Sequence, residues 1–465
     1  MHGCRTLCLA ATALCLGIAP ARAQGPGTAR PPTSDPLPQE PADPQDEARD
    51  AGLPTSIAWT FTFDAGWGSF GFANSLYTNN RPDPSGNLSD NWFEGYMKPG
   101  LAARHPIGTS EVYGKVSFVG ERTYGAAPTL VGEDASSFKQ EDLYAGWRSG
   151  TSLGSDTDLV DLTVGRAPYT IGHGFLVWDG GGEGGSRGGF WTNARKAWRY
   201  AAIGRVTPGA HTIEGFWLVR DDVPEAEAGN ALAGANYEYA WGDHSTFGVT
   251  YLRTFADPAI LFERDGMHVV HARAYAAPLP RLRNLSFEGE YAHEKNRDRL
   301  ASTAWSALGA YEISHVAWKP KLSYRYAYFQ GDDPDTPESE AFDSLFLGFY
   351  DWGTWWQGEI AGEYFLSNSN SVSHQVRVHL TPSDTFSWGA FGYLFRLDQP
   401  AGFEGGVASR DVAVEFDAYA DWTFRQHFTL SLLGASAAPR DAAKQAYDRS
   451  KAFWYGMAFL AYTFR

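Results

Sequence analysis

Residues 454–464 read WYGMAFLAYTF, and this stretch decides the fold. An alternation with a period of two is typical of a β-strand, because successive side chains of a strand point to opposite faces. The stretch therefore predicts a terminal strand with one apolar face that carries an aromatic ring at each end. Counting back from the last aromatic residue, this face consists of Phe464, Tyr462, Leu460, Ala458, Gly456 and Trp454.

The same alternation recurs along the chain and predicts the fold class. It begins at Ile57, where every second residue up to Trp67 is apolar, and it returns in about 18 spans of roughly 10 residues, the length that a tilted strand needs to cross a bilayer. A sheet in lipid must close on itself, because an open edge would leave backbone groups unpaired. We therefore predict an all-β protein, a transmembrane antiparallel β-barrel of about 18 strands over residues 53–465.

The N-terminal 52 residues predict two segments that precede the barrel. Residues 1–23 combine basic Arg5, an apolar stretch and a small-residue cleavage site, which is the pattern of a secretory signal peptide. Residues 24–52 are rich in proline and acidic residues, and we expect a disordered leader there. All three cysteines lie inside the signal peptide, so the mature chain needs no disulfide framework.

Composition and the C-terminus point to one compartment. The chain contains 17 Trp, 23 Tyr, 29 Phe and 51 Gly, which suits a barrel with aromatic girdles and glycines where strands bend. Its last strand resembles the insertion signal of Gram-negative outer-membrane barrels, although Arg465 follows the final aromatic residue. We expect an outer-membrane protein whose partners include the lipid bilayer and lipopolysaccharide. Tight turns such as 241–244 and 381–384 are expected on the periplasmic side, and long polar segments at 77–91, 124–137, 330–341 and 399–410 outside.

The positions that alternate with the apolar stripes carry many charges. A packed core rejects unpaired ions, because burying one costs several kcal/mol or more, whereas a water-filled lumen accepts them. We therefore expect these residues to line a polar conduit, although any single charge also fits a salt bridge across the wall. The basic positions are Arg273, Lys321, Arg325 and Arg377, and the acidic ones are Asp161, Glu288, Glu290, Glu415 and Asp417.

Residues 164–189, VGRAPYTIGHGFLVWDGGGEGGSRGG, depart from the alternation. The first half predicts a strand that carries Arg166 inward, and the glycines exclude a stable strand after about Leu176. The second half predicts a loop that either folds into the pore or lies outside it. Residues 190–199 then form a basic and aromatic stretch with Arg195 and Arg199, which suits contacts with sugars and carboxylates or with lipid headgroups.

Three groups of short motifs resemble the alginate export family of outer-membrane barrels. They are Val164-Gly165-Arg166 with Gly172-His173-Gly174, Trp178-Asp179 and Arg195; Pro320-Lys321-Leu322 with Tyr328, Gly331-Asp332-Asp333 and residues 342–346; and Val414-Glu415-Phe416-Asp417. The resemblance implies a monomeric barrel through which an anionic polysaccharide such as alginate diffuses outward, with a possible periplasmic export partner. It implies a basic wall of Arg166, Arg195, Arg325 and Arg377, and a loop carrying Asp332 and Asp333. The balance of charge departs from the family, since residues 53–465 contain 34 basic and 48 acidic residues.

Other functions have weaker support in the sequence. A general or sugar-selective porin for small solutes is the main alternative, because it uses the same barrel. No GxSxG motif or clear grouping of Ser, His and acid residues predicts an enzyme, and His173 between two glycines is expected to be a loop or lumen residue. Asp332, Asp333 and Asp335 are a calcium candidate without the EF-hand pattern. We expect no cofactor and no nucleic-acid partner.

Overall fold

The computed structural model describes residues 57–75, 90–125, 127, 134–155, 158–178, 180–242, 245–277, 284–348, 350–351, 354–355 and 357–464. The predicted signal peptide and leader lie outside the described residues, as do most of the predicted loop 77–91 and part of the loop 124–137. No helix within the described ranges is long and apolar enough to cross a membrane.

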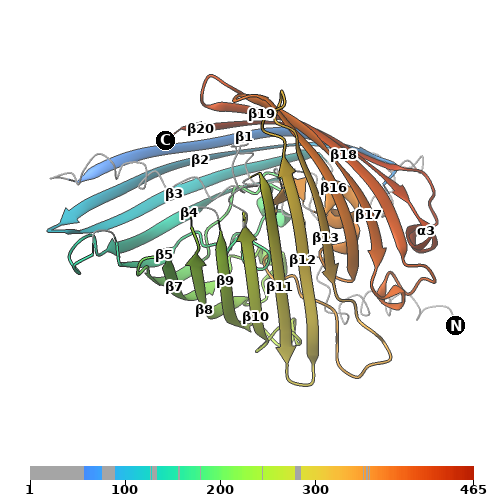
Figure 1. The fold of residues 1–465 in the computed structure, drawn as a ribbon, viewed down its shortest axis with the longest axis horizontal. Helices are drawn as coiled ribbons and strands as arrows, with labels where there is room; N and C mark the ends of the chain where they lie inside the picture. The colour runs from blue at the N-terminus through green and yellow to red at the C-terminus, as the bar shows by residue number, and fades with distance from the viewer. Residues whose placement is uncertain are drawn as a thin grey trace.

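Eighteen antiparallel strands form one closed sheet, which confirms the predicted fold (Figure 1). The first strand pairs with both the second and the last, so the sheet has no free edge. The barrel strands are β1 (Ala58–Ala73), β2 (Asp90–Ile107), β3 (Ser110–Gly125), β4 (Asp134–Arg148), β5 (Val160–Arg166), β6 (Tyr200–Val206), β7 (His211–Val219), β8 (Ala231–Ala240), β9 (Thr246–Phe255), β10 (His268–Ala276), β11 (Leu285–Asn296), β12 (Leu300–Glu312), β13 (Lys321–Phe329), β16 (Ser371–Ser383), β17 (Phe386–Leu397), β18 (Asp411–Phe424), β19 (Phe428–Pro439) and β20 (Phe453–Phe464).

Short elements lie in the connections between these strands. They are the 3-10 helices η2 (Gly185–Arg187), η3 (Pro224–Ala226) and η5 (Pro400–Gly402), the two-residue strands β14 (Tyr350–Asp351) and β15 (Thr354–Trp355), the π-helix η4 (Gly358–Leu366), and the α-helix α3 (Asp441–Tyr447).

The two faces of the sheet follow the alternation read from the sequence. In β1, Trp59 and Phe61 are exposed on the outside of the barrel, and in β20 Trp454 is exposed while Phe453 and Tyr455 are buried. An apolar outer surface is what a barrel presents to lipid. The predicted outward stripe of the terminal strand is therefore confirmed.

The beginning of β1 and the end of β20 lie at the same end of the barrel, because the two strands pair antiparallel from Phe63 opposite Phe464 onward. The short connections, such as the one that joins the end of β8 to the start of β9, also lie at this end, which is the periplasmic end in outer-membrane barrels. One predicted turn differs, since residues 381–383 belong to β16. The predicted loop 330–341 is only the first part of a connection that spans residues 330–370.

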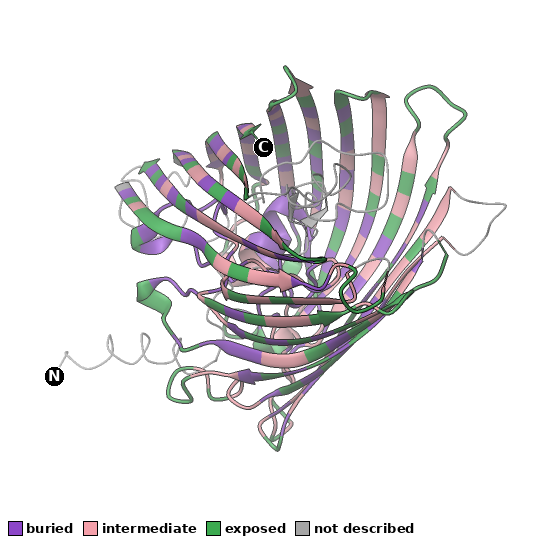
Figure 2. Ribbon diagram, turned by 90° about the vertical axis from the view of Figure 1, so that its left-hand side faces the viewer, coloured by how far each residue is buried: buried purple, intermediate pink, exposed green. Residues whose placement is uncertain are grey.

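Two long connections send much of their described length into the barrel: 167–199, between β5 and β6, and 330–370, between β13 and β16, whose first part lies at the rim beside the β11–β12 hairpin. Figure 2 shows buried segments inside the ring of strands. Strand β5 ends at Arg166 rather than near Leu176, because Gly165 has a φ of +125° and Pro168 cannot donate a ladder hydrogen bond. Of the two predictions for the glycine-rich segment, the one that folds it into the pore is therefore confirmed. We call these segments the first and the second inward loop.

The interior is apolar on one side, which differs from the uniformly wet lumen that we expected. Trp191 of the first inward loop packs against Phe70, Trp92 and Tyr455 of the wall, with ring centroids 5.6–6.3 Å apart. The physical reason is that a loop inside a barrel needs an apolar bed, since burial of apolar surface contributes about 25 cal/mol per Å². The wall side of this bed includes Phe70, Phe72, Trp92, Tyr96, Phe391, Tyr393, Phe395, Phe453, Tyr455 and Phe459.

Candidate functional site

The two inward loops are joined to each other inside the barrel. The backbone N–H of Phe346 donates to Leu176 O at 3.0 Å, and Phe346 O accepts from the N–H of Trp178 at 2.9 Å. These bonds form a parallel bridge between Val177 and Phe346, and Gly348 N–H adds a third bond to Gly174 O at 3.2 Å. The joined loops narrow the lumen, so any solute that crosses the barrel must pass them.

The tip of the first inward loop docks on the wall formed by β10 and β11. The His173 ring stacks on Tyr275 with centroids 3.6 Å apart, and the backbone N–H of His173 donates to the Tyr275 hydroxyl at 3.1 Å. Gly172 is required here, because its φ is +55° and a Cβ would lie 2.7 Å from Arg273 Cδ. Burial lowers the pKa of His173 to about 4, against the opposing charge of Glu290, so the imidazole is neutral at pH 7.

A hydrogen-bonded cluster on the wall supports this tip. Glu290 accepts a hydrogen bond from the Tyr275 hydroxyl at 2.6 Å and lies 2.6 Å from His271 Nε2. Phe175 of the loop stacks on His271 with centroids 5.6 Å apart. Glu288 lies further along the same face, 4.0 Å from His173 Nδ1. The predicted lumen residues Glu288 and Glu290 therefore hold the loop tip.

Wall carboxylates hold the inward loops by their backbone. Glu94 on β2 accepts the N–H groups of Trp191 at 2.6 Å and Thr192 at 3.1 Å. Glu415 on β18 accepts two N–H groups at the start of η4, Ile360 at 2.9 Å and Ala361 at 2.7 Å. Buried N–H groups need partners, and these carboxyl oxygens provide them. Some acidic residues of the sequence therefore hold loops, and the predicted lumen residues Glu415 and Asp417 belong to this group, since Asp417 accepts a hydrogen bond from Glu359 N–H at 3.4 Å.

Arg195 is buried within the first inward loop, contrary to the expectation that it lines an open path. Its side chain is fully buried and its Nε lies 3.0 Å from Glu121 Oε2 on β3. Its backbone N–H donates to Glu183 at 2.5 Å. Burial, together with the nearby charge of Glu121, holds the pKa of Glu183 well above its usual range. Removing one partner from such a network leaves an uncompensated buried charge, so Arg195 is a structural residue of the loop.

Arg166 and Arg199 meet at Asp221, just after β7. Asp221 accepts a hydrogen bond from Arg166 and lies 3.2 Å from Arg187 and 3.6 Å from Arg199. Burial alone would raise the pKa of Asp221, but the hydrogen bond and charge of Arg166 lower it below its usual value. Arg199 also pairs with Glu227 at 2.5 Å and keeps about a third of its side chain exposed.

The other four predicted basic residues follow one wall in order. Arg273 lies on β10, Arg325 on β13 and Arg377 on β16, and the strand register places them, with Lys321, at four successive inward positions toward the periplasmic end. Such positions are roughly 6.7 Å apart along a strand. Arg273 and Arg325 are 4% and 2% exposed beneath the loop tip, whereas Arg377 and Lys321 are partly exposed beyond it. We call these four residues the basic row.

Arg273 and Arg377 of the basic row each contact polar groups of the wall. Arg273 donates to Glu238 at 2.5 Å and Asn236 at 2.7 Å, and Arg377 donates to the Tyr419 hydroxyl at 2.7 Å. The Arg377 guanidinium also lies over the Phe391 ring at 4.9 Å. Arg377 is thus held by a neutral hydroxyl and an aromatic ring, and its charge also acts on the buried carboxyl group of Asp421 on β18.

The opposite wall carries charges that the sequence reasoning missed. Lys115 on β3 lies 3.0 Å from Asp142 on β4, and Arg148 lies 2.8 Å from the predicted lumen residue Asp161. A β-bulge opposite Ser117 turns both Glu141 and Asp142 inward, which no simple alternation predicts. The missed basic residues could have been found from the sequence, because they alternate with apolar positions on their strands. The missed residues are Lys98, Lys115, Arg148 and Arg205.

The calcium candidate is not assembled into a site. Asp332 accepts the backbone N–H of Glu340 at 2.9 Å, and Asp333 accepts that of Asp335 at 3.0 Å, so both aspartates shape the loop. In the described part of the chain, no three His, Cys, Asp or Glu side chains are grouped in a way that could hold a metal ion.

The fold and the loop-narrowed lumen define a class of protein. An 18-stranded closed barrel with an apolar exterior, charged interior walls and inward loops is the architecture of an outer-membrane β-barrel. Comparison with solved structures agrees, and that likeness shows the fold.

The chain is similar to OccK7 (OpdD) of Pseudomonas aeruginosa, with 10% sequence identity, a TM-score of 0.53, and coverage of 88% of this chain and 98% of that one. It is similar to OccAB1 of Acinetobacter baumannii, with 10% identity, a TM-score of 0.55 and coverage of 88% and 97%. It is also similar to OpdK of Pseudomonas aeruginosa solved with vanillate, with 10% identity, a TM-score of 0.55 and coverage of 87% and 98%. No protein-family model and no curated protein matches the chain, so the resemblance to the alginate export family is not shown.

Proposed function

We propose that this chain is a diffusion channel of the outer membrane for small, carboxylate-bearing solutes. The observation that carries the proposal is the joining of the two inward loops at Val177 and Phe346. A long polysaccharide needs a wide, continuous conduit, whereas a lumen narrowed by two packed loops suits small molecules. The porin alternative is therefore better supported than export of a polymer.

The basic row supplies the preference for anions. A carboxylate that moves toward the periplasm past the loop tip meets the partly exposed Arg377 and then Lys321, and arginine can bind a carboxylate through two parallel hydrogen bonds. Exposed ion pairs contribute only about 0.2–1 kcal/mol each, so the solute is attracted without being trapped. Salt screens such pairs beyond ~8–10 Å, which keeps the attraction local to the row.

The acidic excess of the chain does not oppose this proposal. The carboxylates of Glu94, Glu141 and Glu415 accept backbone N–H groups of the inward loops. Their carboxyl oxygens are thus occupied by backbone N–H groups of the inward loops. The similar fold of OpdK solved with vanillate adds support, since vanillate is a small aromatic carboxylate.

Single-channel recording in planar bilayers tests the proposal. We expect anion preference in a salt gradient, and flicker block by vanillate that the uncharged analogue vanillyl alcohol does not produce at the same concentration. Cation preference, or equal block by both compounds, would contradict the proposal. A liposome assay with uronate polymers provides the second arm, because passage of long chains would support outward transport of an anionic polysaccharide such as alginate, with a periplasmic export partner.

A further inference from the structure

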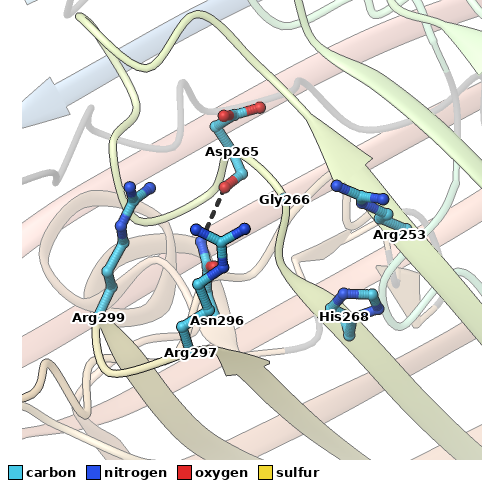
Figure 3. A pocket seen from close by; sticks show the side chains of 7 residues that line it. All are labelled: Arg253, Asp265, Gly266, His268, Asn296, Arg297 and Arg299. Atoms are coloured by element: carbon cyan, nitrogen blue, oxygen red, sulfur yellow. Dashed lines mark hydrogen bonds between the residues drawn. The ribbon is translucent and has the colours of Figure 1, made fainter.

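A cavity outside the lumen lies at the extracellular rim of the barrel. Its volume is about 280 Å³, several times the ~30 Å³ that one water molecule occupies in the liquid. It lies where β9 ends, β10 begins and the β11–β12 hairpin turns (Figure 3). We call it the rim pocket, and its lining residues are Arg253, Asp265, Gly266, His268, Asn296, Arg297 and Arg299.

The rim pocket is strongly basic. Figure 3 shows the side chains of Arg253, Arg297 and Arg299 around it, one from β9 and two from the hairpin. Asp265 is the acidic residue of the lining, and its Oδ1 accepts the backbone N–H of Ala256 at 3.3 Å. Three arginines against one carboxylate leave an excess of positive charge with planar donors, which is the chemistry that binds phosphate.

The framework around the rim pocket is ordered by hydrogen bonds. Asn296 donates to the backbone oxygens of Asp265 at 2.8 Å and Glu263 at 2.6 Å, which ties the hairpin to the β9–β10 loop. The Arg299 guanidinium lies 3.8 Å from the centre of the Phe262 ring and donates to Phe262 O at 3.1 Å. The cations are therefore partly held in place before a ligand arrives.

The position of the rim pocket on the outer face points to an amphiphilic ligand. Arg253 and His268 are paired neighbours whose side chains face outward, and one outward position closer to the membrane are Tyr251 and Val270. Tyr251 and Val270 are 50% and 45% exposed, and the Tyr251 hydroxyl is hydrogen-bonded to His268 Nδ1 at 2.6 Å. A basic rim directly above an aromatic and apolar surface matches a lipid whose phosphate lies above its acyl chains.

The next outward positions continue this apolar surface down the barrel wall. They are the exposed residues Val249 and Phe247 on β9 and Tyr291 and Phe287 on β11. A soluble phosphate would gain nothing from them, whereas acyl chains would cover them. Lys295, which shares the outer face, is paired with Glu338 at 2.8 Å.

We infer that the rim pocket binds the phosphate group of a phosphorylated glycolipid of the outer leaflet, with the acyl chains along β9–β11. The site is separate from the lumen and does not depend on which solute the channel carries. It would anchor the barrel at a fixed height in the membrane.

Native mass spectrometry of the detergent-purified barrel tests this inference. The probes are bisphosphorylated lipid A, the same lipid A after removal of its phosphates, and inorganic phosphate. We expect bisphosphorylated lipid A to bind at least tenfold more tightly than the dephosphorylated form, and inorganic phosphate not to displace it at equal concentration. Equal binding of both lipids would overturn the inference, and displacement by inorganic phosphate would overturn the choice of a lipid as its source.

The matched variants carry the same loss of charge on the same side of the barrel. Combined Arg253→Ala, Arg297→Ala and Arg299→Ala changes should weaken lipid A binding at least tenfold. Combined Arg410→Ala, Arg449→Ala and Lys451→Ala changes, in other extracellular connections, should leave it within twofold. Unchanged binding in the first set, or an equal loss in the second, would overturn the inference. Heat-modifiable gel migration reports folding, and Arg297→Ala alone, at the hairpin, serves if the triple variant does not fold.

Discussion

His173 stacks on Tyr275 with ring centroids 3.6 Å apart, and this contact joins a loop that leaves the barrel after β5 to a wall five strands away. The contact explains why a glycine-rich segment can hold a defined position inside a barrel. It also makes the loop tip sensitive to pH.

The first prediction concerns acidification. The pKa of His173 is lowered to about 4, mainly by burial, whereas a free histidine titrates near 6.5. The undocked loop therefore binds more protons than the docked loop between these values, and docking is fully stable above pH 6.5 and weakens as the pH falls toward 4. Tyr275 on β10 and Glu288 and Glu290 on β11 face His173, and they stay in the barrel wall when the loop tip leaves. We expect larger and noisier single-channel currents at pH 4.5 than at pH 7.5.

His173→Gln is the matched variant for this prediction. Glutamine does not titrate, so the change in current between pH 7.5 and pH 4.5 should shrink. If the variant and the wild type respond equally to pH, another group controls the loop.

A second prediction concerns the wall carboxylates. Glu94→Ala leaves the N–H groups of Trp191 and Thr192 without their acceptor, at a cost of about 1–3 kcal/mol each. We expect a lower thermal midpoint and current noise from a loosened first inward loop. Glu94→Gln keeps an acceptor oxygen, so its thermal midpoint and its current noise should lie between those of Glu94→Ala and those of the wild type. Asp384→Ala, at an exposed periplasmic turn, should change neither measurement.

A third prediction concerns the basic row. Arg377→Glu combined with Lys321→Glu should lower the ratio of anion to cation permeability by roughly threefold or more, since the local field changes sign. Reversal potentials in a salt gradient measure this ratio. Arg425→Glu, on an exposed turn between β18 and β19, changes charge without touching the row and should leave the ratio unaltered. Anion preference that survives the double variant would remove the basic row from the mechanism.

A fourth prediction tests the joined loops. The chain has no cysteine after residue 15, so Val177→Cys with Phe346→Cys offers a single oxidisable pair at bridged positions. Because the loops are already hydrogen-bonded there, oxidation should leave small-ion conductance unchanged while reducing slow gating. A collapse of conductance on oxidation, reversed by a reductant, would mean that the two loops separate when the channel opens.

The fold could be predicted from periodicity because a strand in lipid has little freedom. Each lipid-facing position must be apolar and each backbone group must be paired. The residue types of β1 and β20 therefore show the alternation directly. The alternation with a period of two also placed Arg273, Arg325 and Arg377 on the inner face of the barrel. It failed at Glu141 and Asp142, because a bulge shifts the register without a sequence signature that we recognised.

The candidate site was harder to predict because it depends on contacts between distant segments. The sequence pattern around an inward charged residue is the same whether its side chain contacts water or the backbone of a loop. Arg195 was expected to face the lumen, yet its partners Glu121 and Glu183 bury it completely. Glu415 was expected to line the lumen, yet it accepts a hydrogen bond from the backbone of Ile360 in η4, 55 residues earlier, and no local pattern reveals the place of η4 inside the barrel.

The sequence by itself determined the closed sheet of about 18 strands and, outside the bulge in β4, which side chains face lipid, because lipid-facing positions must be apolar and alternate along each strand. The tertiary structure alone decided that residues 167–199 and 330–370 enter the barrel, that they join at Val177 and Phe346, and which charges remain open to a solute. Those outcomes depend on the pairing of groups far apart in the chain, and desolvation turns a given carboxylate into an anchor or a lumen charge only once its neighbours are in place.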